Sequence, residues 1–157
     1  MSTPRQATEM AAEEALLRLS RECSTACGWL RNSARQLNNS ARKGLLLDIA
    51  NAFERFHQEH ERERERLGAK PADKSSFRGA VSQIAASLVT QFARGHDETL
   101  LKACETSVEQ VLKDFNNTLE LHIEPNTREI LVKQRHELEG LLANLHAASS
   151  AAELDRP

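Results

Sequence analysis

Apolar and small residues recur at alternating spacings of three and four along most of the chain. This spacing places them on one face of an α-helix, whereas a half-buried strand would alternate with a period of two. Four long segments carry such a stripe, over roughly residues 8–37, 40–67, 97–122 and 126–147. The stripe residues are Leu16, Leu19, Cys23, Ala26, Leu30, Ser33 and Leu37; Leu46, Ile49, Phe53, Phe56, His60 and Leu67; Leu101, Cys104, Val108, Val111, Phe115 and Thr118; and Leu131, Gln134, Leu138, Leu141 and Leu145. The pattern predicts an all-α four-helix bundle.

Turn and capping residues separate these segments. The Asn and Ser cluster at 38–40 predicts a tight turn and an N-cap, because short polar side chains bond the free amides of a following helix. Gly68, which follows three arginines, predicts a left-handed C-cap. Pro125 ends the third segment. Asn126 and Glu129 predict a capping box at the start of the last helix.

The second and third long segments are separated by residues 69–96. Pro71 and two serines indicate a loop over 69–76, and the apolar spacing predicts a shorter helix over 77–93. Such a helix would cover about 25 Å, enough to carry the chain along much of the bundle. This long connection predicts a ferritin-like four-helix bundle with an additional short crossover helix, although an up-and-down bundle with an added arm would give a similar pattern.

The stretch from Gly79 to Ala93 contains no charged residue. Surface helices normally carry charge on their polar face, so this helix is expected to be covered on more than one side. Either the bundle and its own loops cover it, or a partner such as a second copy of the chain does. The candidate interaction surface is its apolar face, formed by Val81, Ile84, Leu88 and Phe92.

Length and composition set further limits. The 157 residues suit one domain, which we expect over 9–147 between a flexible N-terminus at 1–8 and a flexible tail at 148–157. A formal charge of −2 disfavours nucleic acid as a partner. No apolar run approaches the roughly 20 residues that span a bilayer, and no signal segment precedes the first helix. Three cysteines without a framework spacing fit free, packed thiols in the cytoplasm.

The candidate metal ligands form an incomplete set. A di-iron bundle needs a glutamate from each of two helices and a Glu-x-x-His pair from each of the other two. Glu54 and His57 are the only such pair, Glu105 and Glu109 lack the histidine, and the first helix offers only Glu22 in its middle. A solvated position or one on the flank of the helix is therefore the favoured interpretation of the Glu54 and His57 pair, over metal ligation.

Two other polar features have plain structural interpretations. In the charged run from His57 to Arg66, glutamates lie three residues before arginines, which stabilises a solvated helix face. Within that run His60 falls on the apolar stripe, where a core histidine bonded to a neighbour is the favoured interpretation over a metal ligand.

Several short features occur in a characteristic order: Gly28-Trp29, the stretch Arg55–His60, the stretch Leu67–Pro71, Cys104-Glu105 and Phe115. In this layout the chain resembles a bacterial family of ferritin-like four-helix-bundle proteins of unknown function, related in fold to the rubrerythrins. The resemblance covers about residues 16–145 and rests mainly on order and spacing.

The chain departs from that family's pattern at polar positions. Trp29 and Phe115 stand where the family has tyrosines. Val108, three residues after Glu105, stands where the family has a second glutamate, and Leu142 lies at or beside the position of an expected histidine. Each change is from polar to apolar. The resemblance with these departures implies a structural or binding role over redox chemistry.

We therefore expect a non-enzymatic bundle that acts through protein association, as a homo-oligomer or with another protein, in a stress response as the resemblance suggests. No cofactor is expected. The alternative is a metal-binding bundle with oxidoreductase or iron-storage activity that uses Glu54, His57, Glu105 and Glu109.

Overall fold

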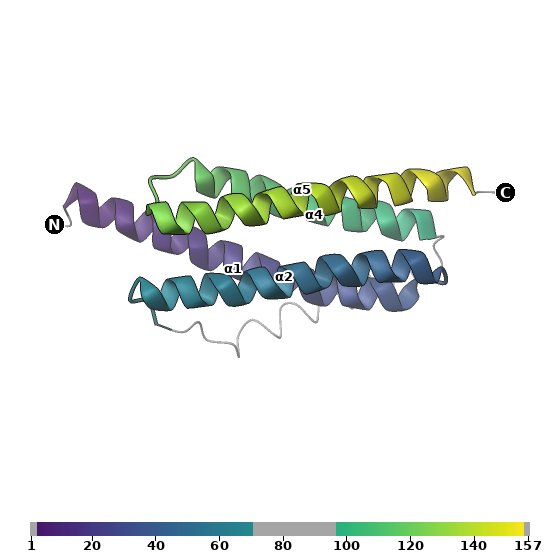
Figure 1. Cartoon of the computed structure of the whole chain (residues 1–157), viewed down its shortest axis with the longest axis horizontal. Helices are drawn as coiled ribbons and strands as arrows, with labels where there is room; N and C mark the ends of the chain where they lie inside the picture. Colours follow the sequence, from purple (N-terminus) through teal and green to yellow (C-terminus); the bar gives the residue numbers. More distant parts are fainter. Residues whose placement is uncertain (1–2, 71–96, 156–157) are drawn as a thin grey trace.

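The computed structural model describes residues 3–70 and 97–155, and these residues form four α-helices and no strand (Figure 1). The helices are α1 (Pro4–Gln36), α2 (Ser40–Arg66), α4 (Asp97–Leu119) and α5 (Pro125–Leu154). The expected helix over 77–93, with its face of Val81, Ile84, Leu88 and Phe92, lies outside the described residues. The prediction of an all-α protein with four long helices is confirmed.

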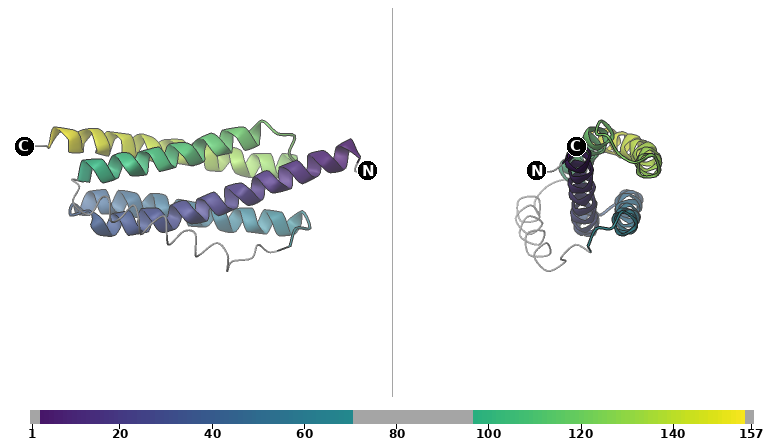
Figure 2. Two further views of the ribbon diagram at one scale, coloured as in Figure 1. Left: turned by 180° about the vertical axis from the view of Figure 1, so that it is seen from behind. Right: turned by 90° about the vertical axis from the view of Figure 1, so that its left-hand side faces the viewer.

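The helices form two antiparallel hairpins, α1 with α2 and α4 with α5, which lie side by side (Figures 1 and 2). Helices α2 and α4 run in the same direction. Ion pairs between the hairpins fix this arrangement, because Arg42 near the start of α2 contacts Asp97 at the start of α4 at 3.1 Å. At the opposite end, Arg66 contacts Glu124, the residue before α5, at 2.9 Å.

The four predicted stripes form one hydrophobic core. Every stripe residue of α1 and α4 is buried, which confirms the helical spacing in these two segments. At the centre, the rings of Phe53 and Phe56 meet edge-on with centroids 6.2 Å apart, and Phe56 meets Phe115 at 6.0 Å. Leu67 was wrongly placed in the core, since α2 ends at Arg66 and this side chain is 44% exposed. Leu141 is only partly buried.

The helix ends follow the predicted caps in two places. The Asn39 side chain accepts a hydrogen bond from the Arg42 amide at 3.0 Å, as an N-cap does. Gly68 has a φ of +88°, the left-handed conformation that closes α2. These two predictions are confirmed.

Three helix ends differ from the sequence expectation. Helix α1 begins at Pro4 and not near Thr8, because Thr3 and Gln6 form a capping box in front of it. Helix α4 ends at Leu119 and not near residue 122. Helix α5 continues to Leu154 and not to residue 147, since Ser149 and Ala152 are buried.

The predicted capping box at Asn126 and Glu129 is wrong. Helix α5 begins at Pro125, a residue well suited to the first helical position, and Glu124 before it makes no side-chain cap. The Asn126 side chain instead contacts the carboxylate of Glu63 on α2 at 3.3 Å. None of the helices in the described ranges is long and apolar enough to span a membrane.

Candidate functional site

The candidate metal ligands on α2 face α1. Glu54 is exposed and forms an ion pair with Arg31. The ring of His57 lies against Ser20, with Nδ1 at 3.0 Å from the Ser20 carbonyl oxygen and 2.9 Å from its hydroxyl. The Ser20 hydroxyl in turn donates to Glu61 at 2.7 Å, so these groups join α1 to α2.

The candidate ligands on α4 occupy another face of the bundle. Glu105 pairs with His146 of α5, and Glu109 is exposed. The structure therefore does not bring Glu54 and His57 together with Glu105 and Glu109. In residues 3–70 and 97–155, no group of three or more His, Cys, Asp or Glu side chains could hold a metal ion.

The centre of the bundle contains a short chain of buried polar groups. His60 has no exposed surface, and its Nε2 donates to Gln134 Oε1 at 2.6 Å. This tautomer follows from the network, because the Gln134 amide nitrogen donates to Glu59 at 2.6 Å and leaves its oxygen as the acceptor. Burial lowers the pKa of His60 to about 4. The interpretation of His60 as a core histidine bonded to a neighbour is confirmed.

The charged run at the end of α2 is more buried than its pattern predicts. The expected pairs form, Glu61 with Arg64 at 2.9 Å and Glu63 with Arg66 at 2.6 Å. However, the side chains of Glu63 and Arg64 are each only 5% exposed, so a fully solvated face is wrong at these two positions. The first turn of α5 packs against Glu63, and Thr127 Oγ1 donates to it at 2.6 Å. Hydrogen bonds from Arg66, Thr127 and Asn126 hold the pKa of Glu63 below its usual value.

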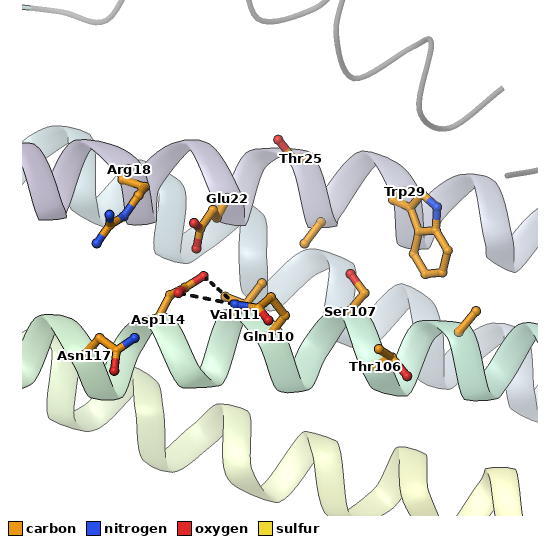
Figure 3. Close-up of a pocket in the computed structure, with 12 residues that line it drawn as sticks. Arg18, Glu22, Thr25, Trp29, Thr106, Ser107, Gln110, Val111, Asp114 and Asn117 are labelled. Atoms are coloured by element: carbon orange, nitrogen blue, oxygen red, sulfur yellow. Dashed lines mark hydrogen bonds between the residues drawn. The ribbon is translucent and has the colours of Figure 1, made fainter. Parts of the chain in front are cut away.

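A groove of about 860 Å³ lies between α1 and α4 (Figure 3). Its apolar wall includes Trp29, and its polar end includes a carboxyl group from each helix. The residues that line it are Arg18, Glu22, Thr25, Ala26, Trp29, Ala103, Thr106, Ser107, Gln110, Val111, Asp114 and Asn117. A groove of this size with mixed apolar and polar walls is the candidate site.

Glu22 and Asp114 point toward each other across the groove (Figure 3). Burial, followed by the hydrogen bond and the negative charge of Asp114, raises the pKa of Glu22 to about 8, while Arg18 acts in the opposite direction. Glu22 Oε2 is enclosed and has no donor among the described residues. The geometry therefore favours a shared proton between the two carboxyl groups.

Sequence patterns alone did not identify this pair. Arg18, Glu22 and Trp29 share one face of α1, and Gln110 and Asp114 share one face of α4, because their spacings are four and seven residues. Those spacings are visible in the sequence. Which stripe on α4 faces which stripe on α1 depends on how the two hairpins dock, and local spacing carries no such information.

The three cysteines are buried, and burial raises the pKa of each thiol, to about 12 for Cys104. Because the thiolate is the reactive form, we expect all three to react with an aromatic disulfide reagent at least roughly 10-fold more slowly in the native protein than in denaturant. Thiol absorbance titrations with and without denaturant measure this ratio. Rapid native reaction of even one thiol would contradict the buried environment of that cysteine.

Comparison with known proteins assigns the chain to a family without assigning an activity. Neither the curated proteins nor the solved structures contain a significant match. The family described as "Domain of unknown function (DUF2383)" matches residues 11–121, which include most of α1 and all of α2 and α4 but not α5. Because the match spans more than half of the 157 residues, the chain belongs to the DUF2383 family.

Proposed function

We propose that this protein works by binding another protein chain, most simply a second copy of itself, and not by catalysis. The supporting observation is the composition of the bundle interior. The region where a carboxylate-bridged metal pair would lie between four helices is filled by Phe53, Phe56 and Phe115, none of which has exposed surface. A bundle with such a filled centre can act through its outer surface.

We also propose that the four helices are connected in the ferritin-like manner. Helices α2 and α4 run in the same direction, so the chain between Lys70 and Asp97 joins opposite ends of the bundle (Figure 1). A four-helix bundle with antiparallel hairpins and one long crossover connection has this arrangement. The parallel direction of α2 and α4 supports the proposal, whereas an up-and-down bundle would make them antiparallel.

The contact surface that we propose is the apolar stripe of Val81, Ile84, Leu88 and Phe92 in that connection. The supporting feature is its sequence context, since residues 79–93 contain no charged side chain. The resemblance to ferritin-like bacterial proteins is the sole support for placing this association in a cytoplasmic stress response.

Size-exclusion chromatography with light scattering tests the proposed association. We expect the wild type to be larger than the 17.6 kDa of one chain and Leu88→Arg to return to that mass, because a buried unpaired charge opposes association. Ser87→Arg, which introduces the same side chain one residue earlier on the polar side of the stripe, serves as the matched control and should keep the wild-type mass. A wild type that is monomeric and binds no partner in a co-purification from its native cells would overturn the proposal.

Metal analysis tests the competing function separately. We expect no stoichiometric iron after anaerobic iron loading and desalting, since Glu54 pairs with Arg31 and Glu105 with His146 on different faces. One or more iron ions per chain that are lost in His57→Ala would establish a metal centre and reverse our conclusion about catalysis.

A further inference from the structure

The groove between α1 and α4 brings two acidic side chains together, and among the described residues that line it there is a single positive charge. Among its lining residues, Glu22 and Asp114 are the acids and Arg18 is the one cation. Arg18 lies one turn before Glu22 on α1, and Asp114 faces Glu22 from α4 (Figure 3). Two ionised carboxylates in a partly buried site repel each other, and a single proton between them replaces this repulsion with a hydrogen bond.

The neighbouring groups indicate which carboxyl carries the proton. The Gln110 amide nitrogen lies 3.5 Å from both Asp114 oxygens, so it is placed to donate to a carboxylate. Glu22 Oε2, by contrast, is enclosed and receives no hydrogen bond from the described residues. A proton on Glu22 turns an unsatisfied acceptor into a hydroxyl that donates to Asp114, which satisfies both groups.

We propose that Glu22 and Asp114 form a proton-controlled latch: a shared proton holds α1 against α4, and its loss separates the two helices and opens the groove. Protonated Glu22 donates its O–H to the Asp114 carboxylate. Removal of the proton by hydroxide leaves two facing carboxylates, whose repulsion Arg18 compensates in part.

The direction of the pH response follows from the raised pKa of Glu22. The pKa of Glu22 is about 8 in the folded protein, whereas an unperturbed glutamate, as in the unfolded chain, has a pKa of 4.5. The folded protein therefore retains a proton that the unfolded chain loses. The stability that the proton contributes is fully present below pH 4.5 and is lost as the pH rises through about 8. The latch should therefore be closed at neutral pH and open at mildly alkaline pH.

Trp29 provides a reporter inside the same groove. It is the only tryptophan, the chain has no tyrosine, and its side chain is largely buried at 8% exposure. Burial raises the pKa of Cys23 and Cys27 above their ordinary value of 9.0, so these thiols do not titrate in the same range. A change in Trp29 accessibility near pH 8 thus reports on the groove.

The test measures quenching of Trp29 fluorescence by acrylamide between about pH 6 and about pH 9. In the wild type we expect the quenching constant to rise roughly two-fold with a midpoint near pH 8, as local opening exposes the ring. Glu22→Gln should abolish the rise, because an amide has no proton to lose in this range. Asp114→Asn should also weaken the rise, since an ionised Glu22 then faces a neutral amide, which can donate to it, and no longer a second carboxylate. Glu109→Gln, an exposed position on α4, should behave like the wild type.

Three results would overturn the latch. The first is a wild-type quenching constant that does not change with pH. The second is a rise that persists in Glu22→Gln, which would assign it to another group. The third is a change in the emission spectrum without any change in acrylamide access, which would mean that the charge acts on the indole while the helices stay together. Far-ultraviolet circular dichroism at each pH verifies that the variants remain helical.

Discussion

Replacing Phe115 with alanine is expected to lower the free energy of unfolding by about 3–5 kcal/mol, the usual cost of truncating a buried phenylalanine. Phe115 has no exposed surface and lies where α4 meets α2, with its ring centroid 6.0 Å from that of Phe56 and 5.9 Å from that of His60. Truncation removes both ring contacts and leaves a cavity in the hydrophobic core. Urea denaturation followed by circular dichroism measures the change.

Lys113→Ala on the same helix is the matched control for this substitution. Lys113 is exposed, so its removal should change the unfolding free energy by no more than about 0.5 kcal/mol. A loss below about 1 kcal/mol for Phe115→Ala would mean that the centre of the bundle is loosely packed. The proposed non-enzymatic function would then lose its main support, because that function depends on a filled interior.

The core was predictable because helical spacing is a local property of the sequence. Leu16, Leu19 and Leu30 recur with the period of an α-helix, and the apolar face that they form must be buried against another part of the protein. The periodicity fixes which side of each helix faces inward without reference to any other helix. The predicted burial is therefore correct at every stripe position of α1 and α4. The prediction that Leu67 is buried is wrong because α2 has already ended at Arg66.

The helix ends were less predictable because several local signals compete for the same backbone groups. Asn126 followed by Glu129 has the spacing of a capping box, but Pro125 favours the first helical position and starts α5 one residue earlier. Asn126 then contacts Glu63 on α2, a partner 63 residues away in the sequence. A local rule cannot anticipate such a contact.

The same limitation applies to the buried charges and to the groove. Glu63 and Arg66 pair as their spacing predicts, yet the packing of α5 decides that Glu63 is buried. Glu22 and Asp114 have no unusual sequence context. Their chemistry arises from their positions opposite each other on two helices, which only the docking of the two hairpins determines. For this reason the candidate metal residues could be found in the sequence while the carboxyl pair could not.

His60 makes stability fall in mild acid, and His60→Gln is expected to remove most of that fall. Burial lowers the pKa of His60 to about 4 from the 6.5 of an exposed histidine, so the unfolded chain takes up a proton that the folded protein refuses. The stability that neutral His60 contributes is present above pH 6.5 and is lost as the pH falls through about 4. The shift corresponds to about 2–3 kcal/mol over this range. A glutamine can still donate to Gln134 but has no proton to gain.

The comparison of wild type with His60→Gln at each pH isolates this contribution. Glu22 has the opposite effect on stability over the same pH range, because its raised pKa makes protonation favour the folded state. This effect is present in both proteins and cancels in the difference between their stabilities. Glu63, with its lowered pKa, loses its contribution only below the ordinary glutamate value of 4.5. His136→Gln, at an exposed position on α5, is the matched control for the loss of an imidazole. Parallel pH profiles for wild type and His60→Gln between pH 6.5 and 4.5 would show that His60 takes up a proton in the folded protein as readily as in the unfolded chain, which would contradict its neutral, buried state.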